Sequence, residues 1–380
     1  MLPKERVAAA FAHQPSDKVP IYQGGFSSRA ASAVLGREAY VGGGIQQYRE
    51  ARALWEGPDA HAEFLQRSRQ DAWDLVRTLD LDLVRPSYWR LPVKPTRRLD
   101  EFTFFYGREE DTWRVMRFDP ALELYQEVAA SPQPPLTRED LERTVVAAEE
   151  SLATYAPKAA DFPELAAAQA EFGAERAVPG GGIAVCVPRE AAWLEAVALY
   201  PDLVGRYLNA QAEYAARTAP VMAQLGLRYL MGGGDFASKN GPFYSPRAFH
   251  NLMLPALRRV SEACHAVGAY HMFASDGDLW PVAEDLFGAS GVDCFYEIDR
   301  RAGMDLARLR TTFPHLTLLG GIASETLHLG TRAEVIQEVR SALAVAKEHG
   351  SIIVGCSNQI VPHTPPENIW AMMETLHAER

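Results

Sequence analysis

The 380-residue chain has only four cysteines, and they are spaced far apart. Cys186, Cys264, Cys294 and Cys356 lie in or beside apolar runs, and no two of them form a CxxC pair. This pattern argues against a disulfide framework and indicates a protein of a reducing compartment.

Long apolar runs are also absent. No stretch approaches the roughly 18 uninterrupted apolar residues of a membrane-spanning helix. The N-terminus, MLPKERVAAAFAHQPSDKVP, carries charges where a signal peptide has its apolar core. We therefore expect a cytoplasmic protein without a membrane segment.

Positive charge is scarce, because 38 Lys and Arg stand against 49 Asp and Glu, for a formal net charge of -11. This balance argues against broad affinity for nucleic acid or an anionic membrane. The GxGxxG and P-loop motifs, which cradle phosphates, and the nucleophile elbow GxSxG are missing as well.

The composition that remains is that of a folded globular protein, with 47% hydrophobic and 23% charged residues. In the second half, short apolar runs of strand type alternate with helical patterns, which is the sign of parallel βαβ units. The expected strands lie near 227–232, 269–273, 292–296, 316–319 and 352–354. Caps at Ser245 and Thr331 mark the starts of two of the helices between them.

The first half is less regular, with plausible strands at 19–23, 81–85 and 183–187. Together the two halves predict an α/β fold, a (β/α)₈ TIM-type barrel, with an open doubly wound sheet as the rival. We expect residues 1–380 to form a single domain. An aromatic-rich insertion at about 87–120 alternates like a β-hairpin and is expected to serve as a lid or rim.

In a barrel of this kind the active site lies at the carboxyl ends of the strands. The polar residues that end the expected strands are Asp235, His271, Asp276, Glu297, Cys356 and Asn358. Carboxylate, imidazole and thiolate are the ligands of catalytic zinc, so these residues permit a zinc site. Asp235 and Asp276 are equally candidates for acid–base work or for holding loop backbone. For His271 and Cys356 the alternatives are a hydrogen-bonded wall histidine and a small buried residue.

The insertion begins with Tyr88 and Trp89, and Arg85 and Arg90 flank them. Such aromatics suit a flat or methoxylated aromatic substrate, and arginines bind carboxylates in bidentate fashion. The alternative for the aromatics is a hydrophobic staple that closes the barrel.

Seven segments spread over most of the chain form a recognisable set. They are KERVAAAFAHQPSDKVP at 4–20, GGGDFASKNGPFYSPRAF at 232–249, SDGD at 275–278, AGMDLARLR at 302–310, GGI at 320–322, LGTRAEVIQEV at 329–339 and PHTPPENI at 362–369. Together they resemble the uroporphyrinogen decarboxylase superfamily, which implies a distorted (β/α)₈ barrel. One branch decarboxylates uroporphyrinogen without a cofactor, and the other moves methyl groups between a corrinoid protein and a thiol or methoxy compound, using zinc.

The decarboxylase branch carries an R-Q-A-G-R segment after its first strand, and this chain keeps one arginine there, in the run from Gln23 to Arg29. That branch also has a histidine where Asn358 stands. By this resemblance Gln23, Arg29 and Asn358 join the aromatic residues Tyr88 and Trp89 as the candidate substrate-binding residues. We also count Tyr244, in the segment 232–249, among the catalytic candidates with Asp235 and Asp276.

The thiol-methylating branch binds zinc through an H-x-C pair and a second cysteine. His271 fits this pattern, but Phe273 and Asn358 replace the two cysteines, and Cys356 lies two residues early. The resemblance therefore implies a mixed zinc set of His271 and Cys356 with Glu297 or Asp235.

Our first hypothesis is a corrinoid-dependent methyltransferase that acts with a separate corrinoid protein on a small methoxylated or thiol compound. A separate protein is expected because Asp59-Ala-His61 lacks the glycine of a corrinoid-binding motif, with Phe64 in its place. The alternatives are a cofactor-independent decarboxylase and a non-catalytic barrel that binds a small ligand. Because barrels of this family often pair, the resemblance also allows a homodimer.

Overall fold

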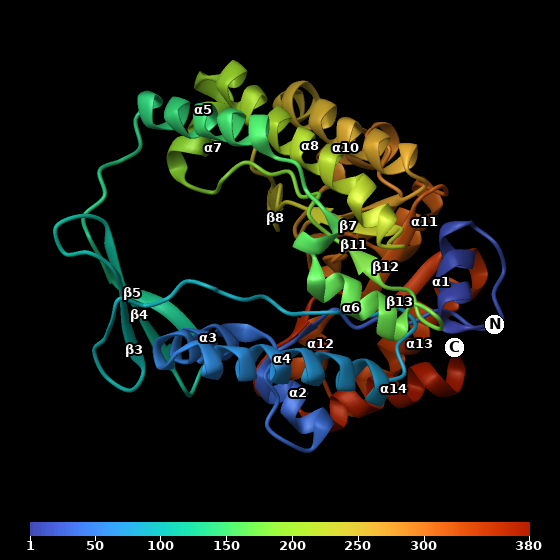
Figure 1. Ribbon diagram of the computed structural model, residues 1–380. Helices are drawn as coiled ribbons and strands as arrows, with labels where there is room; N and C mark the ends of the chain where they lie inside the picture. The colour runs from blue at the N-terminus through green and yellow to red at the C-terminus, as the bar shows by residue number, and fades with distance from the viewer.

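A computed structural model describes all residues, 1–380, and its centre is a curled sheet of six parallel strands (Figure 1). The strands follow the order β13-β12-β11-β10-β7-β6. Their bounds are β6 Pro179–Gly180, β7 Tyr229–Gly233, β10 Tyr270–Ala274, β11 Cys294–Tyr296, β12 Thr317–Ile322 and β13 Ile352–Cys356. The parallel register runs without a break from Leu318 opposite Ile352 to Met272 opposite Cys294. The second half of the chain therefore has the βα order that the sequence predicts.

Two further segments extend the edges of this sheet by single bridges. Ile21 pairs with Val354 of β13, and Leu83 pairs with Ala177, just before β6. The two segments also contact each other, because the Asp82 N–H donates to the Ile21 carbonyl at 3.0 Å. The expected strands at 19–23 and 81–85 are thus reduced to one bridging residue each, and eight regular strands are not formed.

The expected strand at 183–187 is wrong, because this segment pairs with no strand. The strand lies earlier, at Pro179–Gly180, and three consecutive glycines end it. The segment then crosses over β7, where a Cβ on Gly232 would lie 2.8 Å from the Ile183 carbonyl oxygen. Its residues Ile183, Val185 and Val187 are buried by this crossing, which explains an apolar pattern without strand pairing.

Helices cover the outside of the sheet. In the first half they are α1 Pro3–Phe11, α2 Ser28–Leu35, α3 Gly43–Glu56, α4 Pro58–Thr78, α5 Arg138–Thr154, α6 Pro163–Phe172, α7 Ala191–Leu199 and α8 Pro201–Gln224. In the second half they are α9 Pro246–Ala248, α10 Leu254–Ala266, α11 Leu306–Thr312, α12 Ser324–Leu329, α13 Arg332–His349 and α14 Pro366–Glu379. The caps at Ser245 and Thr331 are confirmed, because each side-chain oxygen accepts from a first-turn N–H. Between β10 and β11 the chain forms a 3₁₀ turn, Trp280–Val282, and a π-helical segment, Glu284–Ala289.

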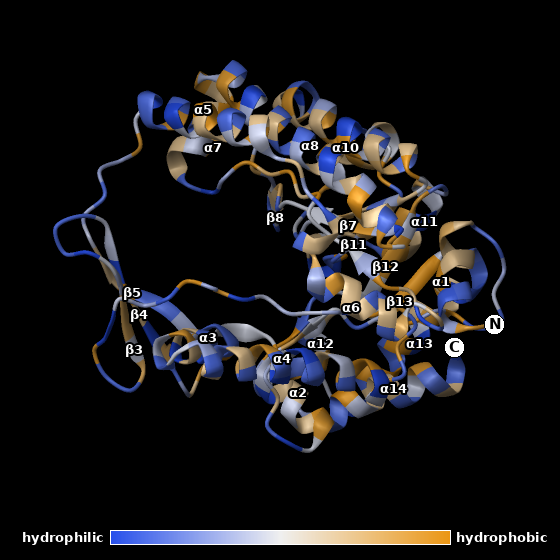
Figure 2. Ribbon diagram, viewed as in Figure 1, coloured by the Kyte–Doolittle hydropathy of each residue, from blue (hydrophilic) through white to orange (hydrophobic).

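Helix α1 closes one end of the curled sheet. Its residue Phe11 packs on Tyr229 and Tyr270, with ring centroids 4.8 Å apart in both pairs. Met272 and Leu319 continue this inner cluster of ten buried residues, while a larger core lies between the sheet and the outer helices. In Figure 2 the strands β12 and β13 are accordingly hydrophobic in colour. Because α1 fills the amino ends of the strands, a site has to lie at their carboxyl ends.

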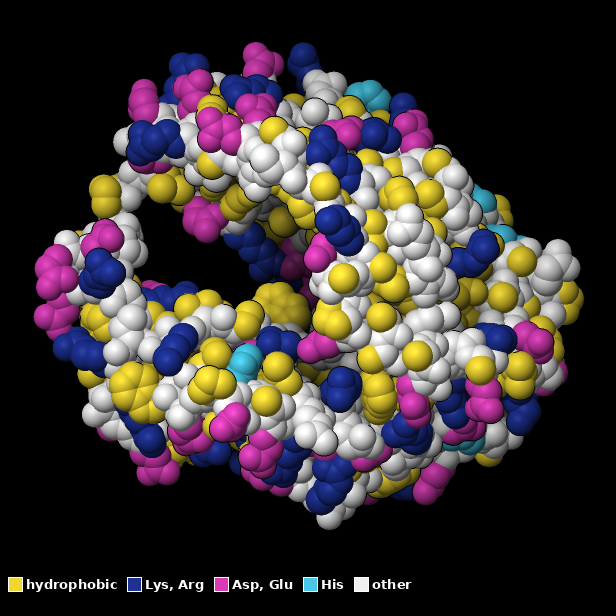
Figure 3. Space-filling model, in the orientation of Figure 1, with side chains coloured by type: hydrophobic (Ala, Val, Ile, Leu, Met, Phe, Trp, Pro, Cys, Tyr) yellow, Lys and Arg dark blue, Asp and Glu magenta, His cyan; other side chains and the backbone are white.

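The predicted insertion is an antiparallel sheet that is larger than the expected hairpin. It contains β2 Arg97–Arg98, β3 Thr103–Gly107, β4 Trp113–Asp119 and β5 Leu124–Ala130. Its small core includes Tyr48 of α3, whose ring stacks on Phe118 at 4.6 Å. Figure 3 shows a wide opening between this sheet and the helices α5 and α7. None of the helices combines the length and apolar character that a bilayer span requires.

Candidate functional site

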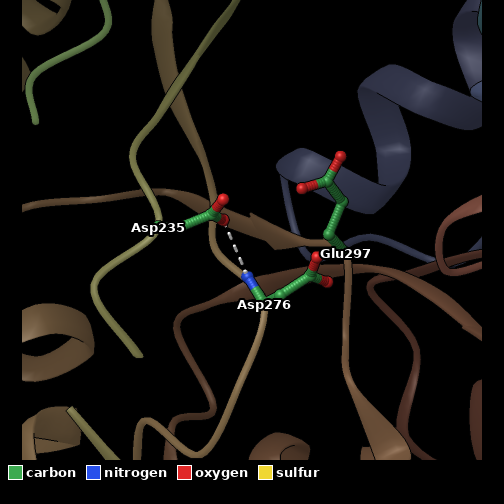
Figure 4. A group of neighbouring side chains, drawn as sticks. All are labelled: Asp235, Asp276 and Glu297. Carbon is green, nitrogen blue, oxygen red and sulfur yellow. Dashed lines mark hydrogen bonds between the residues drawn. The ribbon is translucent and has the colours of Figure 1, made fainter. Parts of the chain in front are cut away.

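Three carboxylates meet at the carboxyl ends of the central strands (Figure 4). Asp235 follows β7, Asp276 follows β10 and Glu297 follows β11, and one oxygen of each lies within 4.8 Å of the others. The structure therefore brings together three of the strand-end residues that the sequence singled out. Neighbouring parallel strands place them side by side, as the βα order requires.

Glycines allow the loops that carry Asp235 and Asp276 to pack closely against neighbouring segments. A Cβ on Gly234 would lie 2.6 Å from Cys186 Cβ, and a Cβ on Gly277 would lie 2.7 Å from the Ala237 carbonyl carbon. Gly277 also has φ of 94°, a conformation that L residues rarely adopt. The glycine-rich runs around Asp235 and Asp276 thus serve the close packing of the loops that carry the two acids.

Each aspartate has partners within the chain. The Asp276 N–H donates to Asp235 Oδ1 at 3.3 Å, and the Asn358 side-chain amide donates to both Asp276 carboxylate oxygens at 3.1 Å. Arg189 forms an ion pair with Asp235. Arg189 was not identified as a site residue from the sequence alone. Arg189 follows the apolar run 183–187 by two residues, at a position where a strand-end residue is expected.

Glu297 has the most unusual environment of the three acids. Burial and the neighbouring Asp276 charge raise its pKa to about 7, against the opposing effect of Arg85. Its backbone has φ of 65°, an uncommon value for a residue other than glycine. Burial and Asp299 also raise the pKa of Asp276. Glu297 is therefore partly protonated near neutral pH and can give or take a proton there.

A cavity of about 350 Å³ opens beside Glu297. Its lining includes Tyr22, Arg85, Tyr88, Trp89, Tyr296, Cys356 and Asn358, together with the glycines 24, 25 and 42–44. Tyr88 is buried, whereas Trp89 is 78% exposed and stands at the rim. Three of the five predicted substrate-binding residues, Tyr88, Trp89 and Asn358, thus line this cavity.

His271 does not reach the cavity, which corrects its assignment as a metal ligand. Its side chain points to the outer face of β10, where Nδ1 lies 2.8 Å from the Ser261 hydroxyl of α10. Burial lowers the pKa of its imidazole to about 3, so the ring stays neutral. His271 is the hydrogen-bonded wall histidine that was the alternative.

Cys356 lines the cavity but is 3% exposed, and burial raises the pKa of its thiol to about 12. The predicted zinc set of His271, Cys356 and Glu297 is therefore not assembled, and the residues present do not fit a His/Cys zinc centre. The group that could offer ligands to a cation is the carboxylate set Asp235, Asp276 and Glu297.

Gln23 and Arg29, predicted to bind substrate, make contacts within the chain. The Gln23 amide donates to the Gly25 carbonyl at 3.1 Å and accepts from the Cys356 N–H at 3.2 Å, which ties two chain segments together. Arg29 Nε lies 3.6 Å from Glu123 at the turn before β5. Neither residue lines the cavity.

Tyr244, predicted as catalytic, is 6% exposed and packs against Phe236. Its hydroxyl has no hydrogen-bond partner, and it is absent from the cavity lining. Tyr244 lies near Arg189, the ion-pair partner of Asp235, but no hydrogen bond joins it to the acids.

Comparisons with known proteins agree with this architecture. The family model described as uroporphyrinogen decarboxylase (URO-D) matches residues 185–379, just over half of the chain. A uroporphyrinogen decarboxylase of Dichelobacter nodosus is 25% identical over 130 residues, which are 34% of this chain and 36% of that protein. A solved methyltransferase from Methanosarcina mazei superposes with a TM-score of 0.59 and 18% identity, covering 100% of this chain and 99% of that one. The last likeness shows the shared α/β fold. On the match of the family model, the chain belongs to the uroporphyrinogen decarboxylase family.

Proposed function

We propose that this protein transfers the methyl group of a small methoxylated compound to the corrinoid of a separate protein, with Glu297 as the proton donor. The observation that carries the proposal is an acid with a pKa of about 7 that faces an aromatic-lined cavity. When a methyl–oxygen bond breaks, the leaving oxygen needs a proton, and an acid with such a pKa supplies it well at neutral pH.

The size and charge of the cavity argue against uroporphyrinogen itself. Its volume of about 350 Å³ lies at the low end of ligand pockets, which run from about 300 to 1,000 Å³. Arg85 is the one cationic residue in its lining. A tetrapyrrole that carries many carboxylates needs more room and more cations, so a compound with a single aromatic ring is the better fit.

The zinc ligand set bears on the choice between a thiol and a methoxylated substrate. Thiol activation depends on a metal-bound thiolate, and the zinc ligand set that the family resemblance implies is not assembled here. A methoxy compound needs a proton donor instead, and Glu297 provides one. We therefore favour the methoxylated substrate over the thiol.

In the proposed reaction the substrate ring lies against Tyr88 with its methoxy oxygen toward Glu297. The corrinoid supplies the reduced cobalt that accepts the methyl group. As the methyl–oxygen bond breaks, the Glu297 carboxyl gives its proton to the leaving oxygen, and the resulting carboxylate regains a proton from water. Asp276 keeps Glu297 protonated between turnovers, because its nearby charge disfavours a second carboxylate.

The antiparallel sheet completes this picture. We propose that the sheet and its connecting strap, residues 85–96, act as a rim, because Tyr88 and Trp89 on the strap line the cavity. The opening between the sheet and the helices α5 and α7 gives a corrinoid protein a path to the strand ends (Figure 3). In this proposal the whole chain, residues 1–380, acts as a single domain.

Decarboxylation is the second candidate. The same Glu297 could protonate a carbanion after loss of carbon dioxide, and Arg85 could hold a carboxylate. The curated relative from Dichelobacter nodosus bears the name of a decarboxylase. This candidate predicts carbon dioxide as a product and no need for a corrinoid.

The test is to incubate the purified protein with cob(I)alamin and a panel of methoxylated benzenes, and to measure the demethylated product and carbon dioxide. We expect demethylation, with kcat in Glu297→Gln lowered about 100-fold or more. Glu127→Gln, an exposed change on β5, is the matched control and should keep full activity. Release of carbon dioxide without corrinoid, or an unaltered rate in Glu297→Gln, would overturn the proposal.

A further inference from the structure

Arg85 is a half-buried cation that forms no ion pair with an acidic side chain. Its Nε donates to the Ser87 carbonyl at 3.1 Å, and the Tyr22 hydroxyl lies within hydrogen-bonding reach of its side chain. The guanidinium carbon lies 4.9 Å from the centroid of the Tyr88 ring. Arg85 is among the residues that line the cavity.

Other buried arginines of the chain are satisfied within the protein. Arg49 pairs with Glu38 at 2.6 Å and also donates to the Ala39 carbonyl. Arg310 has no acid partner, but it donates to three backbone carbonyls, those of Gly350, Pro314 and His349. Arg85 differs from both, because it forms no ion pair and donates to a single backbone carbonyl, which leaves it able to bind a carboxylate.

The residues around Arg85 indicate which kind of anion it would bind. Tyr22, Tyr88 and Tyr296 surround it with aromatic walls, and the first two are at most 8% exposed. A guanidinium binds a carboxylate through two parallel hydrogen bonds, and the walls accept a flat ring attached to it. Glu297 lines the same cavity, and the charge of Arg85 opposes the rise of its pKa.

We propose that the substrate is an aromatic acid, bound with its carboxylate on Arg85 and its ring between the tyrosines. This inference rests on the proposed function for the identity of the reacting group, a methoxy substituent turned toward Glu297. It adds the substrate class and makes Arg85 the residue that determines specificity. A neutral methoxylated compound of the same shape leaves Arg85 unpaired and is discriminated against.

The test is calorimetric binding of 4-methoxybenzoate and of 4-methoxybenzyl alcohol, which needs no turnover. We expect the wild type to bind the acid at least 10-fold more tightly than the alcohol. In Arg85→Met the acid should bind about 10- to 100-fold more weakly, with the alcohol unchanged, and Arg85→Lys should fall between the two. The control is Arg114→Met, which removes a cation on β4 that lies over the Tyr106 ring, outside the cavity.

The outcomes separate this inference from the proposed function. Equal binding of acid and alcohol by the wild type, or an unaltered acid affinity in a folded Arg85→Met or Arg85→Lys, would overturn the inference whatever the reaction. Selective, Arg85-dependent binding of the acid without methyl transfer would uphold the inference and count against the proposed function. Melting temperatures of each variant show that the fold is kept.

Discussion

Replacement of Glu297 by glutamine should change how the stability of the protein depends on pH. The folded state holds the pKa of Glu297 at about 7, above its ordinary value of 4.5. A folded pKa above the unfolded one means that the unfolded chain loses this proton first as the pH rises. Glu297 therefore lowers the free energy of unfolding progressively from about pH 4.5 to pH 7, and the loss is complete above pH 7.

The magnitude follows from the shift. At about 1.4 kcal/mol per pKa unit, the change from 4.5 to about 7 corresponds to roughly 3.5 kcal/mol. Because the carboxyl borders a cavity that water can enter, we expect about 2 kcal/mol. Glutamine cannot ionise, so the variant escapes this loss.

The assay is urea unfolding of the wild type and Glu297→Gln at pH 5 and pH 8.5, with Glu127→Gln as the control. The difference in unfolding free energy between Glu297→Gln and the wild type should grow by about 2 kcal/mol in favour of the variant at the higher pH. The unfolding free energy of the control should equal that of the wild type at both pH values. If the unfolding free energy of Glu297→Gln does not increase relative to the wild type at pH 8.5, Glu297 has an ordinary pKa. This result would contradict its role as a proton donor at neutral pH.

Three further changes test other parts of the site. Asn358→Ala removes two hydrogen-bond donors to the Asp276 carboxylate, so the pKa of Asp276 should rise and the acid limb of the pH–rate profile should move to higher pH. An acid limb that does not move would contradict the assigned contact. Gly277→Ala should lower stability by about 1–3 kcal/mol through its φ of 94° and the contact with Ala237, and an unchanged melting temperature would refute this. His271→Ala should cost about 2 kcal/mol of stability and leave the metal content by mass spectrometry the same as in the wild type, whereas loss of bound zinc would restore His271 as a ligand.

Local signals explain why the second half of the fold could be predicted. The caps at Ser245 and Thr331 and the regular spacing of apolar residues agree with the βα order, so local and global preferences coincide there. In the first half, the segment 183–187 has the composition of a strand, but its burial comes from crossing the glycines of β7. Periodicity cannot distinguish these two causes of burial.

The site shows the same division. Asp235, Asp276 and Glu297 could be brought together from the sequence, because residues that follow parallel strands share one end of the sheet. The sequence did not show which way His271 points. Side chains along a strand alternate between its two faces, so an error of one residue in the register assigns a side chain to the opposite face. Met272, its neighbour, points inward, and His271 points outward to Ser261. The role of Arg85 depends on the lack of a partner, which only the folded contacts reveal.

The most direct test of the central claim is to follow the fate of a labelled methyl group. 4-Methoxybenzoate carrying ¹³C in the methoxy carbon is incubated with the protein and cob(I)alamin, and the products are read by ¹³C NMR. We predict that the label moves to the corrinoid and that 4-hydroxybenzoate appears in equal amount with its carboxylate intact. Label that stays on the aromatic ring while the carboxylate is lost as carbon dioxide would contradict methyl transfer and support decarboxylation.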